Sequence, residues 1–313
     1  MRKAYLHIGL PKTATTSIQK SLSESRQELR NNGLLYPGDD IDHALMIPTF
    51  HQNGGQHFRF ARRNMSPENA VEASTTFIAG LVEEFRQFDG DVLISSEYFS
   101  DIDQSKVVEL RDFFAKSGLV LEIVCYVRHP VAQVTSSLNQ RIKLGRTTLE
   151  EGLVALAWQS SRITLEPYLS ALGRKNLHVR SFNQAVVKGP TNDLLSIVGY
   201  HGSLDNVKQL RGNDSLSMAG VFLVDQINQL YGDSSQHRKK RQLMLGVGGQ
   251  KFQLPAATAS LVEERGQEEV AWLKQTFQVE PLGPESNDCY QTPFDEEAIR
   301  DIVQLMVRVG YRL

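Results

Sequence analysis

The feature that most constrains the fold of this chain is a short apolar run followed by a glycine turn, a lysine and several hydroxyl side chains. Residues 4–8 are mostly apolar and predict a buried strand, and residues 9–16 read GLPKTATT. A helix is predicted from Thr15 to Asn31, with Gly33 as its C-cap. A helix N-terminus that follows a strand and a tight turn presents free backbone N–H groups, which attract anions. The sequence therefore predicts a site for a phosphate-like anion directly after the first strand.

This loop departs from the phosphate-binding pattern GxxxxGK[ST] in the position of its lysine. Gly9 takes the place of the first glycine, but Ala14, Thr15 and Thr16 stand where that pattern has glycine, lysine and a hydroxyl. The lysine comes three positions earlier, at Lys12. We expect Lys12, the two threonine hydroxyls and the loop N–H groups to hold the anion together. The simpler interpretation is an ordinary hydroxyl-rich helix start.

Predicted strands and helices alternate along the first two thirds of the chain. Further strands are expected over residues 34–36, 91–95, 119–127 and 177–181, and further helices over 67–88, 104–116, 131–142, 149–172 and 192–198. Alternation of this kind favours an α/β, P-loop-type fold in which a mostly parallel sheet lies between two layers of helices. Beyond about residue 201 the pattern is mainly helical. We predict a single domain over residues 1–313, with a nucleotide-binding core over 1–200 and a helical extension over 201–313.

Two more chemically active side chains follow predicted strands. Glu97 comes after the strand at 91–95 and Arg128 after the strand at 119–127, so both are expected at the carboxyl edge of the sheet, where ligands bind. Glu97, among aromatic and hydroxyl neighbours, could act as a general base, or it could be a solvated surface carboxylate. Arg128 and Ser136, eight residues later on a polar helix stripe, could converge on a second phosphate. The alternative for this pair is an internal salt bridge and a solvated helix face.

Composition excludes several classes of function. A formal net charge of −2 argues against bulk binding of nucleic acid, and two cysteines, Cys125 and Cys289, make no disulfide framework and favour a reducing compartment. No apolar run approaches the roughly 18 residues of a membrane span, and a first strand at Ala4 leaves no room for a signal peptide. These features lead us to expect a cytoplasmic protein. We also expect no metal site, because no spacing of His, Cys or acidic residues suggests one. The oligomeric state stays open.

Together these motifs resemble the sulfotransferases that use 3′-phosphoadenosine 5′-phosphosulfate (PAPS). GLPKTATT resembles their 5′-phosphosulfate loop, and Arg128 and Ser136 resemble their 3′-phosphate motif. The segment SSEYF, residues 95–99, resembles the one that carries the catalytic glutamate in heparan-type carbohydrate sulfotransferases and their bacterial relatives. The resemblance covers roughly residues 4–182, with a fainter match at RGNDS, residues 211–215.

The resemblance implies PAPS as sulfuryl donor, no metal, and a hydroxyl or amine acceptor on a carbohydrate or glycoconjugate. It implies catalytic roles for Lys12 and Glu97. The residues expected to bind the nucleotide are Gly9, Pro11, Lys12, Thr13, Ala14, Thr15, Thr16, Arg128, Ser136 and Arg211. Ala14 stands where the family has glycine, so the loop either avoids a glycine-only conformation there or is strained.

Acceptor recognition is assigned to the irregular segment at residues 37–65. Its basic side chains, which could meet hydroxyl or acidic groups of a saccharide, are His43, His51, His57, Arg59, Arg62 and Arg63. A plain polar surface loop is the alternative. A basic run at residues 237–241 could draw in a polyanionic acceptor or could be a solvated helix end.

Two other functions fit parts of the pattern. A P-loop kinase for a small molecule, using ATP and Mg²⁺, predicts a lysine at position 15, which Thr15 contradicts, and an acidic Mg²⁺ ligand after an apolar strand. A nucleotide-binding protein without catalytic activity would need neither Lys12 nor Glu97, and both are present.

Overall fold

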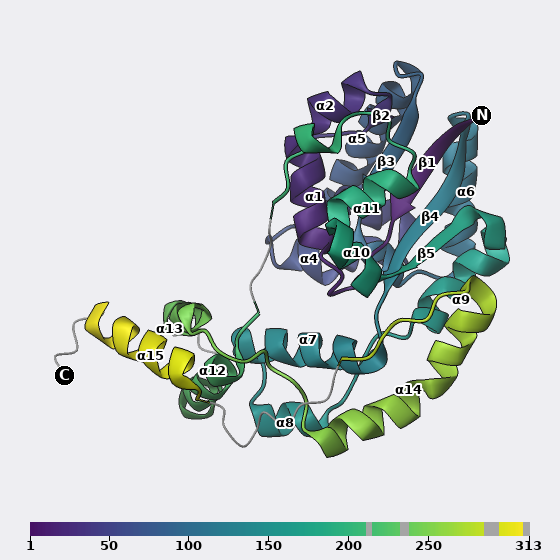
Figure 1. Cartoon of the computed structure of the whole chain (residues 1–313). Coiled ribbons are helices and arrows are strands. Elements are labelled where there is room, and N and C mark those ends of the chain that lie inside the picture. The colour runs from purple at the N-terminus through teal and green to yellow at the C-terminus, as the bar shows by residue number, and fades with distance from the viewer. Residues whose placement is uncertain (211–214, 232–237, 285–293, 309–313) are drawn as a thin grey trace. The chain divides into compact units, whose positions relative to one another are not determined.

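The computed structural model describes residues 1–210, 215–231, 238–284 and 294–308 (Figure 1). The chain forms two compact units, and each is described by itself. The first unit comprises Met1–Arg128, Gln159–Gly212 and Ala271–Pro281. The second comprises His129–Trp158, Asn213–Val270 and Leu282–Leu313. The single-domain organisation expected from the sequence stays a prediction.

The first unit is built on a five-stranded sheet in which every strand pair is parallel. The strands are β1 (Arg2–His7), β2 (Leu34–Leu35), β3 (Asp91–Ser95), β4 (Leu119–Val127) and β5 (Leu177–Ser181), in the spatial order β2-β3-β1-β4-β5. The predicted α/β class with a parallel sheet is confirmed. Strand β1 lies between β3 and β4, with His7 level with both Ser95 and Val124. The ends of β1, β3 and β4 therefore meet at one edge.

Helices cover both faces of this sheet because alternate strand residues point to opposite sides (Figure 1). One face, including Tyr5, Leu93 and Tyr126, packs against α1 (Thr15–Glu24), α2 (Arg26–Asn31), α10 (Phe182–Lys188) and α11 (Pro190–Ile197). The other, including Leu6, Ile94 and Ile123, packs against α3 (Ile47–Phe50), α5 (Pro67–Arg86), α6 (Gln104–Lys116) and α9 (Ser161–Leu172). The three-layer arrangement is confirmed.

Two long helices of the sequence analysis are interrupted in the structure. The helix expected over 15–31 divides into α1 and α2 at Ser25, whose Oγ accepts the backbone N–H of Lys208 at 3.0 Å. The helix expected over 149–172 divides into α8 (Leu149–Val154) and α9, which begins after the N-cap Ser160. In addition, α10 follows β5 directly, where no helix was predicted. The Thr148 side chain caps α8 and the Ser160 side chain caps α9, and apolar periodicity does not mark such caps.

The second unit is helical. It contains α7 (Pro130–Lys143), α8, α12 (Met218–Tyr231), α13 (Arg238–Leu243), α15 (Glu296–Arg308) and residues 256–270 of α14 (Ala256–Phe277). The predicted apolar stripe of α7, from Val131 through Val134 and Leu138 to Ile142, is buried against α12 and α14. The predicted helical character beyond residue 201 is thus confirmed for the described part of the chain.

Candidate functional site

Hydrogen bonds to β4 hold the loop that follows β1. The N–H of Leu10 donates to the carbonyl of Tyr126 at 3.0 Å, and the N–H of Tyr126 donates to the carbonyl of Gly9 at 2.7 Å. Three loop residues have positive φ: Gly9 at 91°, Lys12 at 70° and Ala14 at 60°. The loop therefore turns sharply at the edge of the sheet, and α1 starts immediately beyond it. Ala14 adopts the left-handed conformation that favours glycine, so of the two options left by the sequence the strained one holds.

The N-terminus of α1 has the properties of an anion site. Its N-cap, Ala14, offers no side-chain acceptor to the first-turn N–H groups, and the first turn holds no acidic residue. The Thr15 side chain is buried, and its Oγ1 has no hydrogen-bond partner within the described ranges. A buried hydroxyl without a partner is costly, so this geometry favours a ligand that accepts its hydrogen bond.

Glu97 lies against the same loop. It opens a 3₁₀ helix, η3 (Glu97–Ser100), that follows β3 after Ser96. A Cβ placed on Gly9 would lie 3.5 Å from Cβ of Glu97 and 3.6 Å from Oγ1 of Thr15. Burial raises the pKa of Glu97, and the positive charge of Lys12 acts against that rise. The structure therefore brings Lys12, Thr15 and Glu97 together around Gly9.

Arg128 continues this site at the end of β4. Its Nη1 donates to the carbonyl of Lys12 at 2.7 Å, and its guanidinium lies over the ring of Phe182, 4.9 Å from the centroid. Its Nε is buried without a hydrogen-bond partner among the described residues, and burial lowers its pKa. Both features favour an anionic ligand beside the loop.

The remaining residues of the predicted nucleotide site differ in how far the structure describes them. Thr13 is buried and donates from its Oγ1 to the carbonyl of Leu10 at 2.6 Å, so it stabilises the turn. Ser136 lies on α7 in the second unit, and its convergence with Arg128 stays a prediction. Arg211, and with it most of the RGNDS match, lies outside the described residues.

The segment at 37–65 contains four short helical elements: η1 (Ala44–Met46), α3, η2 (Gly54–Gln56) and α4 (Phe58–Ala61). His43 is fully buried within it. Its Nε2 lies 3.0 Å from the carbonyl of Pro37, and its Nδ1 lies 3.3 Å from both the N–H and the carbonyl oxygen of Ser95. Burial lowers the pKa of His43 to about 4. His43 therefore joins the segment to β3, and both its ring nitrogens are engaged within the protein.

His51 and His57 lie near Glu97 in a different environment. Their ring centroids are 5.6 Å apart, and the ring of His57 meets the edge of Tyr98, the residue after Glu97, at 5.1 Å. Burial, and next the charge of His51, lowers the pKa of His57. Of the three histidines predicted for acceptor binding, the structure thus brings His57, with His51 beside it, to the neighbour of the candidate base.

Several polar residues of this region have no clear signal in the sequence. Asp42 and Tyr98 both bind the Arg59 guanidinium. His7, on β1 beneath the loop, is fully buried, with its Nδ1 2.8 Å from Oγ of Ser95. Among these buried polar contacts, only that of His7 has a signal in the sequence, which is a histidine within an apolar strand.

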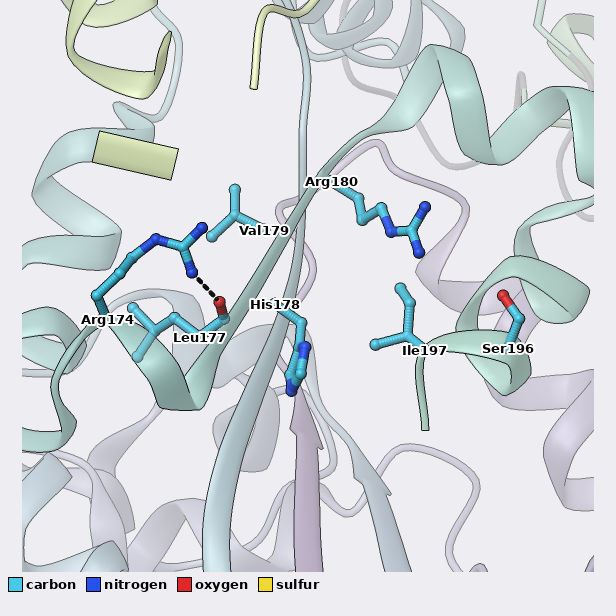
Figure 2. Close-up of a pocket in the computed structure, with 7 residues that line it drawn as sticks. All are labelled: Arg174, Leu177, His178, Val179, Arg180, Ser196 and Ile197. Carbon is cyan, nitrogen blue, oxygen red and sulfur yellow. Dashed lines mark hydrogen bonds between the residues drawn. The ribbon is translucent and has the colours of Figure 1, made fainter. Parts of the chain in front are cut away.

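A separate pocket of about 310 Å³ lies at β5 and α11 (Figure 2). None of its lining residues belongs to the predicted site. Arg174 donates to the carbonyls of Leu177, Thr276 and Phe277, so its guanidinium serves the fold. His178 contacts Glu122 at 2.6 Å, and Arg180 lies 3.7 Å from Asp193. The charged groups of this pocket are thus already engaged.

Two kinds of feature are absent from the described residues. Within the described ranges, no three His, Cys, Asp or Glu side chains are placed to hold a metal ion, and the metal-independent reaction stays a prediction. No described helix has both the length and the apolar character needed to cross a membrane.

Comparison with known proteins finds a similarity at the level of structure. No family model and no curated protein matches the sequence. Among solved structures, the chain is similar to the crystal structure of a sulfotransferase from Alicyclobacillus acidocaldarius, with 17% identity and a TM-score of 0.42. The match covers 68% of this chain and 87% of that chain.

Proposed function

We propose that this protein is a PAPS-dependent sulfotransferase that transfers a sulfuryl group to a hydroxyl or amine of a carbohydrate or glycoconjugate. The observation that supports it most is the arrangement around Gly9: Glu97 and Thr15 flank the loop, and Lys12 interacts electrostatically with Glu97. A base beside a cation at an anion-binding loop is what sulfuryl transfer requires. The motif resemblance supplies the identity of the donor.

In this proposal each residue has one task in a balanced transfer. Glu97 accepts the proton of the acceptor hydroxyl while the acceptor oxygen forms a bond to sulfur. The bond between sulfur and the bridging phosphate oxygen breaks, and its electron pair leaves with the nucleotide. Lys12 and the Thr15 hydroxyl stabilise the negative charge that grows on that oxygen. Like phosphoryl transfer, the reaction then depends mainly on positioning and charge.

Arg128 is proposed to contact the 3′-phosphate, together with Ser136. The buried Nε of Arg128 has no hydrogen-bond partner in the part of the chain that the structure describes, and an anion would supply the missing acceptor. His51 and His57 are proposed to meet the acceptor, since His57 packs on the neighbour of Glu97. The free, buried thiol of Cys125 is in keeping with the cytoplasmic location that we propose.

A nucleotide comparison tests the donor. We expect 3′-phosphoadenosine 5′-phosphate to raise the melting temperature more than AMP or ATP, because a ligand at about 100 times its Kd adds about 2.7 kcal/mol of stability. Transfer from labelled PAPS to a panel of saccharides, lipids, peptides and phenols then identifies the acceptor. Equal shifts with all three nucleotides would contradict the proposal, and Mg²⁺-dependent ATP turnover would favour the kinase alternative.

A further inference from the structure

Arg59 connects the 37–65 segment to the element that carries Glu97. It lies on α4, and its Nη1 donates to the hydroxyl of Tyr98 at 2.8 Å. Its guanidinium also lies over the Tyr98 ring, 5.3 Å from the centroid. Tyr98 follows Glu97 in η3, so Arg59 holds the residue next to the candidate base from two directions.

Asp42 holds Arg59 in this place. Its Oδ1 accepts from Nη2 of Arg59 at 2.9 Å, and its Oδ2 lies 2.7 Å from Nη1. The two side chains are 16% and 17% exposed, so the pair is largely shielded from water. A two-oxygen pairing of a guanidinium with a carboxylate fixes both position and orientation, which a lysine could not reproduce.

We propose that Asp42 and Arg59 form a positioning pair for Glu97: they hold η3 against the 37–65 segment and balance each other's charge beside the Glu97 carboxylate. This inference rests on the proposed role of Glu97 as the base. It changes the expectation for Arg59, which the sequence analysis assigned to contact with the acceptor. In the structure this guanidinium binds Asp42 and Tyr98.

The charges that face Glu97 come from two segments. Lys12 reaches it from the loop after β1, and Asp42 and Arg59 reach it from the 37–65 segment. Burial raises the pKa of Glu97, Lys12 and Arg59 act to lower it, and Asp42 acts to raise it. Since Asp42 and Arg59 act in opposite directions, removal of either one leaves the other uncompensated in a poorly screened environment.

The proposal is tested with two variants of opposite charge change. Glu97 must be ionised to act as a base, so its titration sets the acid limb of the pH profile of kcat/KM. Arg59→Met should move this limb to higher pH, and Asp42→Asn should move it to lower pH. At a pH on the acid limb, we compare kcat/KM divided by each protein's own plateau value. Relative to the wild type, we expect this ratio to be roughly threefold lower in Arg59→Met and roughly threefold higher in Asp42→Asn. Limbs that stay unchanged, or that move in the same direction, would overturn the proposal.

Two controls separate charge from geometry. Arg59→Lys keeps the charge but loses the two-oxygen pairing, so we expect a limb near that of the wild type and a lower plateau. The exposed ion pair between Glu83 and Arg86 provides a matched control, because Glu83→Gln and Arg86→Met change net charge by the same amounts. Neither variant should move the limb. If the acid limb shifts equally in these surface variants, net charge alone moves it, which would contradict a local effect of Asp42 and Arg59 on Glu97.

A direct titration keeps this test independent of turnover. In protein with 13C-labelled glutamate carboxyls, the Glu97 signal is identified as the one that Glu97→Gln removes. The midpoint of its NMR titration should move to higher pH in Arg59→Met and to lower pH in Asp42→Asn. If wild-type protein transfers no sulfuryl group, the proposed function fails while these shifts still report on the pair. If transfer occurs and the signal moves in neither variant, only the pair proposal fails.

Discussion

At the scale of single residues, the candidate site contains a carboxylate that is buried yet close to a lysine. Burial disfavours the charged form of Glu97, and Lys12 favours it. We predict that Glu97→Gln lowers kcat by roughly 10²- to 10⁴-fold, the usual cost of removing a general base. Affinity for 3′-phosphoadenosine 5′-phosphate, the nucleotide product of the proposed reaction, should stay close to that of the wild type when measured by calorimetry. Near-normal turnover of the variant would rule out Glu97 as the base.

The contacts of Arg128 lead to a prediction about which nucleotides the protein prefers. Its guanidinium is held by the Lys12 carbonyl and the Phe182 ring, and its Nε has no hydrogen-bond partner among the described residues. Arg128→Lys keeps the charge but loses the planar fork, so we expect roughly tenfold weaker binding of the 3′,5′-bisphosphate. AMP, which lacks the 3′-phosphate, should lose much less affinity. An equal loss for both nucleotides would show that Arg128 acts only by holding the loop.

At the scale of elements, the loop before α1 has a backbone that its sequence does not favour. Ala14 is in the left-handed region at φ 60° and ψ 20°. That conformation costs roughly 1–2 kcal/mol for a residue with a Cβ, whereas glycine adopts it freely. We predict that Ala14→Gly raises the free energy of unfolding by about 0.5–1 kcal/mol, as measured by urea titration, after the greater flexibility of glycine in the unfolded chain is counted.

The same substitution in a regular helix provides the control for Ala14. Ala115 is exposed on α6, where the backbone is right-handed. Ala115→Gly should therefore lower the free energy of unfolding by about 0.5–1 kcal/mol. Changes of the same sign at both positions would mean that the left-handed conformation of Ala14 does not account for the effect of Ala14→Gly on the free energy of unfolding.

At the scale of the whole molecule, two buried histidines link stability to pH. Burial lowers the pKa of His7 to about 3 and that of His43 to about 4, from an ordinary value of 6.5. Below about pH 6.5 the unfolded chain binds protons at both rings and the folded protein does not. We therefore predict that the free energy of unfolding falls as the pH falls from 6.5 towards 4, by at most about 1.4 kcal/mol per pH unit for each ring.

Urea titrations at several pH values check this linkage. His43→Gln should reduce the slope of stability against pH, even if the variant is less stable at every pH, because one of the two titrating rings is gone. His201, which is exposed, is the matched control, and His201→Gln should leave the slope unchanged. An unchanged slope in His43→Gln would show that this ring binds protons equally in the folded and unfolded states.

The sequence by itself determined the local elements and which charged side chains lie at the sheet edge. Strands β3, β4 and β5 and helix α6 occur at the predicted residues, because apolar periodicity and nearby turn residues decide such elements. Since parallel strands end at a common edge, the same pattern also predicted that Lys12, Glu97 and Arg128 would lie at one edge of the sheet.

Only the tertiary structure decided which polar side chains meet. The inward position of His43, the pairing of Asp42 with Arg59 and the burial of His7 all depend on segments that are distant in sequence and meet only when the sheet is assembled. Ala14 likewise adopts its left-handed conformation within a loop that hydrogen bonds to β4 hold in place. The physical reason is that local propensity extends over a few residues, whereas desolvation and ion pairing depend on the folded environment.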